Sequence, residues 1–246
     1  MYRPENSVSS FVQVSQAQVA PHAGAADMDH RPRAGFVGLG LIARGCKRIF
    51  DLASVVVILA LFWWAIIGVA VAVRLTTGSP VIFGHKRIGR NGREFACYKF
   101  RSMVPNADDV LAHLLATNAE AREEWNRDFK LKDDPRVTRV GRFIRKTSLD
   151  EFPQLWNVIV NDMSIVGPRP VVSKELDQYY TGNSREHYVS VKPGLTGPWQ
   201  VSGRSDMEYA ERVELDRSYV RSWGLWSDFM IVMRTVSVMF KRKGAY

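Results

Sequence analysis

The sequence is poor in the residues that build disulfides and structural metal sites. It contains 2 cysteines, Cys46 and Cys97, without CxxC spacing, and 5 histidines that are scattered along the chain. Disulfide frameworks and structural zinc sites need several such residues at close spacing. We therefore expect neither, and we expect the chemistry to depend on carboxylates, arginines and a hard metal ion.

Charge and proline are both absent between residues 52 and 73. About 20 apolar residues are enough for a helix to cross a bilayer, so this stretch excludes an ordinary soluble protein. A signal peptide would start near residue 1 and would have a shorter apolar core. We therefore interpret the stretch as a permanent membrane anchor, with Asp51 at its interface end.

Basic residues lie on both sides of this anchor, in a chain of 246 residues with a formal net charge of +9. They are Arg44, Lys47 and Arg48 before it, and Arg74, Lys86, Arg87 and Arg90 after it. Loops kept in the cytoplasm carry an excess of Lys and Arg, so the simplest interpretation is a helix that enters one leaflet and returns. Trp63 and Trp64 favour this re-entrant helix because tryptophan prefers the headgroup level. A true crossing stays open, since long domains largely escape the charge rule and the run has no proline to kink it.

The rest of the chain predicts an α+β fold that is mostly helical. Two β-rich runs, 81–85 and 94–100, flank Asn91-Gly92, which suits a type I′ turn, so we predict a β-hairpin. Apolar residues among many charges predict one amphipathic helix over 107–130, which ends before Pro135. Two more short helices are predicted, one over 139–146 and one that starts near Asp150.

The two ends of the chain have different compositions. Residues 1–34 follow neither a strand nor a helix period, which is typical of a disordered tail. Residues 223–240 are apolar on most faces but include Asp228 and Arg234, and basic residues follow them. This pattern suits a helix that lies in the membrane interface, and it equally suits a core helix with a charged end.

The densest polar cluster surrounds Asp150 and Glu151. Pro153 is tolerated only in a first helical turn, so a helix must start close to Asp150. In a structural interpretation, Asp150 caps this helix and Glu151 complements its dipole. In a functional interpretation, the helix start and Arg145 bind a phosphate, Mg²⁺ offsets the two carboxylates, and Asp150 is a nucleophile. The functional hypothesis is phosphoryl-group chemistry at a membrane surface.

Two later segments are rich in glycine and proline. Pro168 and Pro170 fix the backbone around Arg169, which presents its guanidinium group at low entropic cost. The alternative is a rigid loop with an arginine that faces solvent. Residues 192–204 form a loop of the kind that lets backbone approach a ligand, although ordinary turns explain this pattern equally well.

Five motifs in one order resemble the bacterial sugar transferase family, the small monotopic phosphoglycosyl transferases, from about residue 44 to the C-terminus. They are KRIFD at 47–51, YKFRSM at 98–103, TSLDEFPQL at 147–155, DMSIVGPRP at 162–170 and PGLTG at 193–197. Family members often carry a Ser-Pro pair midway along the anchor, whereas this chain has Phe62-Trp63-Trp64 there. The resemblance divides the chain into a tail (1–43), a membrane-anchoring helix (44–75) and a catalytic domain (76–246).

The resemblance implies an enzyme that transfers a hexose 1-phosphate from a UDP-sugar to undecaprenyl phosphate and releases UMP, with Mg²⁺ as cofactor. It places the catalytic domain on the cytoplasmic face of the bacterial inner membrane, with membrane lipid as a partner and no nucleic acid. The segment HKRIGRNG at 85–92 looks most like members that start exopolysaccharide synthesis, including galactose phosphotransferases. UDP-galactose and UDP-glucose are the expected donors, and an N-acetylhexosamine donor is the alternative that the sequence leaves open.

The resemblance also implies roles for single residues. Asp150 matches the nucleophile that forms a covalent phospho-sugar intermediate, Glu151 matches its acid/base partner, and both would lie at the metal. The groups expected to bind substrate phosphate are Arg145, Pro168, Arg169 and Pro170. The expected contacts to the nucleotide-sugar are Gly194, Thr196, Gly197 and Arg204.

One rival function belongs to another class of protein. The basic segments 86–101 and 136–146 would suit a membrane-tethered scaffold that binds anionic lipid or nucleic acid. The sequence contains no nucleic-acid-binding motif. Salt-sensitive DNA binding without turnover of a UDP-sugar would favour this rival.

Overall fold

The computed structural model describes residues 40–128, 131–202 and 207–241, without the side chains of residues 127–128 and 239–241. The predicted tail over 1–34 and the candidate residue Arg204 lie outside the described residues. The described chain is mostly helical with two small sheets, as the sequence predicts.

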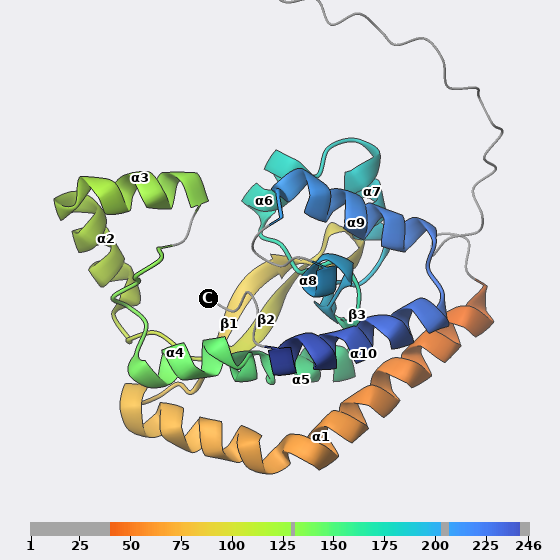
Figure 1. Cartoon of the computed structure of the whole chain (residues 1–246), viewed down its shortest axis with the longest axis horizontal. Coiled ribbons are helices and arrows are strands. Elements are labelled where there is room, and N and C mark those ends of the chain that lie inside the picture. Colours follow the sequence, from red (N-terminus) through yellow and green to blue (C-terminus); the bar gives the residue numbers. More distant parts are fainter. Residues whose placement is uncertain (1–39, 129–130, 203–206, 242–246) are drawn as a thin grey trace, which may run out of the picture. The chain divides into compact units, whose positions relative to one another are not determined.

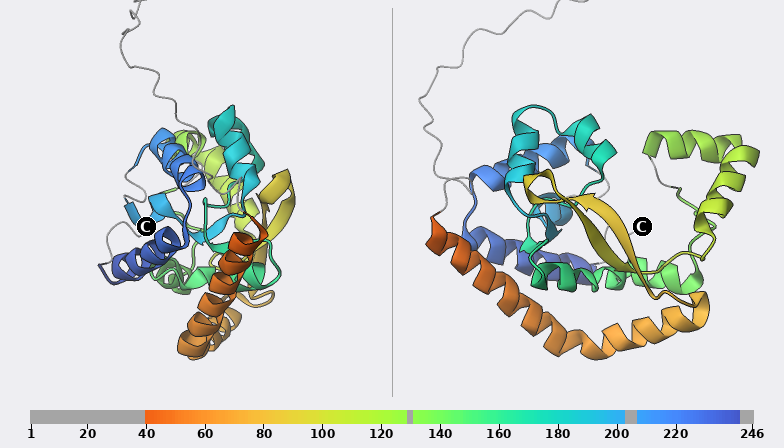
Figure 2. Two further views of the ribbon diagram at one scale, coloured as in Figure 1. Left: turned by 90° about the vertical axis from the view of Figure 1, so that its right-hand side faces the viewer. Right: turned by 180° about the vertical axis from the view of Figure 1, so that it is seen from behind.

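One long helix, α1 (Leu41–Thr77), contains the predicted anchor. The most apolar 18-residue stretch of α1 has a mean hydropathy of 2.8, so α1 is long and apolar enough to cross a membrane. Only 11% of this stretch is buried. Figures 1 and 2 show that α1 is bent near its middle, although it contains no proline. Long helices curve where they wrap around the structure that they pack on, and α1 does so here.

Both halves of α1 pack against the rest of the described chain. The buried residues of the first half are Lys47, Asp51 and Val55, and those of the second half are Val69, Val73 and Thr77. The spacing of four residues places each set on one face of the helix. No residue between Val55 and Val69 is buried, so the middle of α1 presents its apolar side chains outward.

The predicted hairpin is confirmed. Strands β1 (Ile82–Ile88) and β2 (Glu94–Phe100) are antiparallel, and Ile82 lies opposite Phe100. Asn91 and Gly92 both have positive φ angles, 59° and 72°, as a type I′ turn requires. At the open end of the hairpin, a buried apolar cluster joins α1 to β2 and α4 through Val69, Val73, Phe100 and Ile144.

The single helix predicted over 107–130 is wrong, because two helices occupy this segment. They are α2 (Ala107–Thr117) and α3 (Ala119–Asp128). Asn118 between them has an extended backbone, and its Oδ1 accepts a hydrogen bond of 3.0 Å from the backbone N–H of Ala121. Asparagine is among the best N-terminal caps, so Asn118 ends one helix and starts the next.

The remaining elements surround a second, parallel sheet of two short strands. Helices α4 (Arg139–Lys146) and α5 (Gln154–Ile159) lead into β3 (Ser164–Val166), which pairs with β4 (Gly194–Thr196). Figure 1 shows α4 and α5 between α1 and the hairpin, with α6, α7 and α9 farther from α1. The other helices are α6 (Ser173–Tyr179), α7 (Asn183–Ser190), α8 (Pro198–Ser202), α9 (Tyr209–Arg221) and α10 (Leu225–Lys241).

Helix α10 has features of both alternatives that its sequence leaves open. Asp228 and Ile231 are buried in the interior, as in a core helix. The apolar side chains of Trp226, Phe229 and Met233 are exposed, and Trp226 is 72% exposed. One face of α10 therefore packs on the domain, and another presents an apolar strip to the surroundings.

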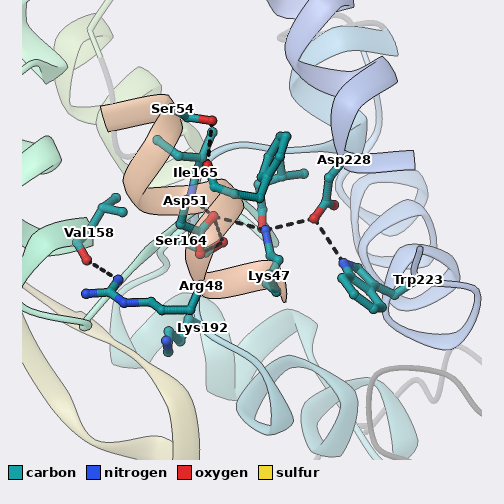
Figure 3. Close-up of polar contacts among 12 residues, drawn as sticks. Lys47, Arg48, Asp51, Ser54, Val158, Ser164, Ile165, Lys192, Trp223 and Asp228 are labelled. Carbon is teal, nitrogen blue, oxygen red and sulfur yellow. Dashed lines mark hydrogen bonds and ion pairs between the residues drawn. The ribbon is translucent and has the colours of Figure 1, made fainter. Parts of the chain in front are cut away.

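A buried ion network joins the start of α1 to β3 and α10 (Figure 3). The Nζ atom of Lys47 lies 3.2 Å from Asp51 Oδ1 and 2.9 Å from Asp228 Oδ2. Asp51 also accepts hydrogen bonds from the hydroxyl of Ser164 (2.8 Å) and the N–H of Ile165 (3.0 Å). Because all three charges are buried, each depends on its partners for stability.

We expect Asp51→Ala to lower the free energy of unfolding by about 3–5 kcal/mol, because it leaves the buried Lys47 with one counter-ion fewer. The exposed Asp162→Ala is the matched control, and we expect it to change stability by about 0.5 kcal/mol or less. The measurement is the thermal unfolding of each purified variant in detergent. Equal midpoints for the two variants would show that the network does not stabilise the fold.

Candidate active site

Asp150 and Glu151 lie in a short 3₁₀ turn, Leu149–Glu151, between α4 and α5. Ser148 before the turn has a left-handed backbone with φ 58°, which ends α4 and reverses the chain. Pro153, at φ −60°, is the N-cap of α5, so the structural interpretation of Asp150 as the cap of that helix is wrong. A proline fits here because the first N–H groups of a helix have no partner within it.

Two apolar side chains hold this turn against the long apolar helix α1. Leu149 and Phe152, on either side of the acidic pair, pack on the apolar cluster that contains Val69 and Val73 of α1. The ring of Phe152 also lies 5.8 Å from that of Phe62, near the middle of α1. The acidic pair is therefore held close to the apolar surface of the protein.

Asp150 is buried, with 8% of its surface exposed. Burial raises the pKa of Asp150 to about 6, the negative charge of Glu151 also raises it, and the positive charges of Lys99 and Arg145 oppose the rise. Within the described residues no side chain donates a hydrogen bond to its carboxylate. The Asp150 carboxylate is thus mostly ionised at neutral pH and its oxygens have no side-chain donor.

Glu151 is shifted in the opposite direction. Burial alone would raise the pKa of Glu151, but the charges of Lys99 and Arg169 and a hydrogen bond from Lys99 hold it below its usual value. The Lys99 Nζ to Glu151 Oε1 distance is 2.7 Å. Glu151 is therefore ionised at neutral pH.

A cleft next to this pair collects several of the candidate residues. It is lined by the predicted residues Glu151, Arg169, Pro170 and Gly194 and, beside them, by Arg87, Lys99, Gln154 and Gln200. The guanidinium group of Arg169 lies over the ring of Trp199, at 5.5 Å from the ring centroid. Three cations, Arg87, Lys99 and Arg169, line the cleft together with Glu151, which makes the cleft suitable for an anion with several charges.

Arg145 approaches the pair from α4 and does not line the cleft. Its Nε donates a hydrogen bond of 2.8 Å to the hydroxyl of Ser102, which fixes the side chain. Its positive charge still lowers the pKa of Asp150, so the two groups are within electrostatic reach. The phosphate-binding role predicted for Arg145 stays a prediction, and the structure places its charge on the Asp150 side of the site.

The glycine-rich candidates play mainly packing roles. Gly194 N donates to Pro168 O (2.8 Å) and Gly167 N donates to Thr196 O (3.0 Å), so the two motifs form one backbone unit. A Cβ atom on Gly197 would lie 2.3 Å from Gly167 O. The hydroxyl of Thr196 lies 2.7 Å from that of Thr235 in α10 and does not line the cleft.

Comparison with known proteins identifies the family. The profile of the family described as bacterial sugar transferase matches residues 42–242. This chain belongs to the bacterial sugar transferase family.

Several relatives of this sugar transferase are known by name. A UDP-galactose-lipid carrier transferase of Erwinia amylovora is 52% identical over 204 residues, which is 83% of this chain and 42% of the relative. An undecaprenyl-phosphate galactose phosphotransferase of Salmonella typhimurium is 52% identical, with the same coverage. The exopolysaccharide production protein ExoY of Rhizobium meliloti is 46% identical over 81% of this chain and 88% of its own length. The chain thus spans less than half of the first two relatives.

Sequence reasoning missed three residues of the transferase site: Arg87, Lys99 and Trp199. Lys99 belongs to a motif that carries the family resemblance, but its place in a strand did not indicate that it reaches Glu151, 52 positions later. The available signal was a lysine among the otherwise apolar and aromatic residues 95–100 of that strand. Trp199 follows a proline in the glycine-rich loop, and nothing in that pattern predicts that it stacks on Arg169.

The acidic pair fits a hard divalent cation. The described residues contain no group of three His, Cys, Asp or Glu side chains placed to hold a metal. Mg²⁺ does not need one, since it is usually held by one or two carboxylates, water and substrate phosphates. Asp150 and Glu151 supply two adjacent carboxylates.

We expect Gly197→Ala to lower the free energy of unfolding of the transferase by about 1–3 kcal/mol, because the new methyl group would overlap the Gly167 carbonyl. Gly45→Ala is the control, since a Cβ there meets nothing within 4 Å and alanine favours the helix. Thermal unfolding in detergent measures both. A fully stable Gly197→Ala protein would return this position to the role of a substrate contact.

Proposed function

We propose that the chain transfers a hexose 1-phosphate from a UDP-sugar to undecaprenyl phosphate and releases UMP, as the first membrane step of exopolysaccharide synthesis. The observation that carries this proposal is the acidic pair. A buried carboxylate without a hydrogen-bond donor among the described side chains lies beside a second, ionised carboxylate, and the charges of Arg87, Lys99, Arg145 and Arg169 act on the pair. The names of the related proteins supply the substrate class.

In the first step, an oxygen of Asp150 attacks the phosphorus that carries the hexose. The bond between this phosphorus and the UMP oxygen breaks, and UMP leaves with the electron pair. The product is a covalent aspartyl phospho-hexose. A nucleophile must be ionised, and a pKa of about 6 leaves Asp150 mostly so at neutral pH.

In the second step, a phosphate oxygen of undecaprenyl phosphate attacks the same phosphorus. The aspartyl bond breaks and regenerates the Asp150 carboxylate. Glu151, ionised beside Lys99, accepts the proton of the incoming phosphate. Arg145 and Arg169 hold the phosphate groups and offset the negative charge that builds up.

We include Mg²⁺ in the proposal, held by Asp150 and Glu151. When bound, it neutralises part of the charge of the diphosphate. Asp150 is suited to this role because its carboxylate accepts no side-chain hydrogen bond within the described part of the chain.

We propose a monotopic arrangement at the cytoplasmic face of the bacterial inner membrane. Both ends of α1 pack on the same domain, which fits a helix that enters one leaflet and returns, and does not fit one that ends on the far side. The exposed apolar strip of α10 would lie at the same membrane surface. Undecaprenyl phosphate would reach the site from the membrane side, and the UDP-sugar would reach it from the aqueous side.

We expect Asp150→Asn to lower UMP release from UDP-galactose or UDP-glucose by at least about a thousandfold, since the nucleophile is lost. Intact mass spectrometry of the wild type without acceptor should show an added hexose phosphate, and undecaprenyl phosphate should discharge it. Glu151→Gln should be severely impaired, and Asp162→Asn, an exposed control, should be normal. Turnover or adduct formation by Asp150→Asn would refute the assignment.

The pH dependence should follow the Asp150 carboxylate. Below its pKa of about 6 the nucleophile is protonated, so kcat/KM for UMP release should fall about tenfold per pH unit on the acid side and level off above it. Lys99→Met removes a charge that lowers this pKa, so the acid limb should move to higher pH. An acid limb at the same pH in both proteins would contradict the link between Lys99 and Asp150.

A further inference from the structure

A second pocket shares no residue with the cleft around Glu151. It forms where the first turns of α1 meet the hairpin turn and the segment before β4. Five cationic side chains and one carboxylate line it: Arg44, Lys47, Arg48, Arg90, Lys192 and Asp51. The mechanism proposed above uses none of them.

Three of these cations have structural partners, and Figure 3 shows those of Lys47 and Arg48. Lys47 belongs to the buried ion network. Arg48 donates to two backbone carbonyls at the end of α5, those of Val158 (2.6 Å) and Ile159 (2.7 Å). Lys192 donates to Asn161 Oδ1. Carbonyl and amide oxygens are neutral, so the charges of Arg48 and Lys192 are not balanced by these contacts.

The other two cations, Arg44 and Arg90, have no ion-pair partner within the described residues. The Nε of Arg90 is buried and has no hydrogen-bond partner in the described part of the chain. A buried donor without an acceptor destabilises the protein, and more strongly when it is charged. An acceptor with negative charge in this pocket would remove that cost.

Lys192 experiences the excess of positive charge. Burial, together with the positive charges of Arg48, Arg90 and Lys47, lowers the pKa of Lys192 to about 8, while Asp51 opposes the shift. One carboxylate, already bound to Lys47 and Ser164, does not offset five cations. The pocket therefore has the electrostatics of an anion site.

The rim of the pocket adjoins the apolar surface of the protein. Ile49, next to Arg48 in the chain, is 70% exposed, and Ile159 and Val160 are exposed beside the carbonyls that Arg48 binds. Cations that border an apolar surface are typical of the headgroup level of a membrane. Of the anions available there, a phosphate group with acyl chains matches both the charge of the pocket and its apolar rim.

We propose that this pocket is a second phosphate-group site, occupied by the phosphodiester of a membrane phospholipid, with Arg44, Arg90 and Lys192 as its ligands. Arg90 Nε gains its missing acceptor, and the acyl chains run along Ile49 and the end of α5. The site would hold the start of α1 and the hairpin turn at the headgroup level. A soluble phosphate is the other source of the same chemical group, and the experiment distinguishes the two.

The test uses the full chain, delipidated in detergent, and native mass spectrometry with increasing phosphatidylglycerol. We expect one tightly bound phosphatidylglycerol on the wild type and about tenfold or greater loss of affinity in Arg90→Gln, which removes a charged hydrogen bond. Arg93→Gln, an exposed arginine beside the same turn, is the matched control and should bind like the wild type. Diacylglycerol, which lacks the phosphate, should not occupy the site.

A second arm titrates inorganic phosphate and follows thermal unfolding without lipid. If inorganic phosphate stabilises the wild type but not Arg90→Gln, while both bind phosphatidylglycerol equally, the phospholipid assignment is overturned in favour of soluble phosphate. If Arg90→Gln equals the wild type in both arms, the site itself is overturned. Arg44→Gln, at an exposed position, is the second variant should Arg90→Gln fail to fold. Asp150→Asn should bind phosphatidylglycerol normally, so this result is independent of the proposed catalysis.

Discussion

The position of the long apolar helix α1 depends on one shared cation. Lys47 is buried between Asp51 and Asp228, and the two carboxylates accept further hydrogen bonds from Ser164, Ile165, Tyr219 and Trp223. Charges this deep are tolerated only when their partners surround them. Because these partners come from α1, β3, α9 and α10, the network fixes where the apolar helix leaves the domain. The ion network and the contact of Phe152 with α1 together set the distance between the acidic pair and the apolar surface.

The two carboxylates of the acidic pair have different surroundings, which shift their pKa values in opposite directions. Asp150 is buried and has no side-chain hydrogen-bond donor within the described residues, so its pKa rises toward neutrality. Glu151, one residue later, turns toward Lys99 and Arg169, and its pKa falls. Groups whose environments push their pKa values apart are suited to separate roles in one reaction. The 3₁₀ turn is what allows the difference, since it faces adjacent residues toward different surroundings.

Short sequence patterns predicted those elements whose structure depends on neighbouring residues in the chain. Asn91-Gly92 identified the hairpin, the apolar run identified α1, and the polar cluster with its proline identified the acidic pair. Errors arose where one polar side chain decides between two local structures, as Asn118 does between α2 and α3. Contacts over long separations were also out of reach: Lys99 with Glu151, Arg169 with Trp199, and Asp51 with Ser164. The sequence predicts that Asp51 lies at the membrane interface. In the structure Asp51 is instead a buried counter-ion of Lys47.

The buried network also constrains the order in which the protein is completed during synthesis. Lys47 and Asp51 leave the ribosome early, whereas Asp228 comes from the last described helix. Until α10 has been made, Asp51 is the only carboxylate of the network that pairs with Lys47, whose other acceptor, the Val166 carbonyl, is neutral. The attachment of α1 to the domain is therefore incomplete until α10 has been made. The ion pair between Lys47 and Asp228 can form only after this helix near the C-terminal end has been synthesised.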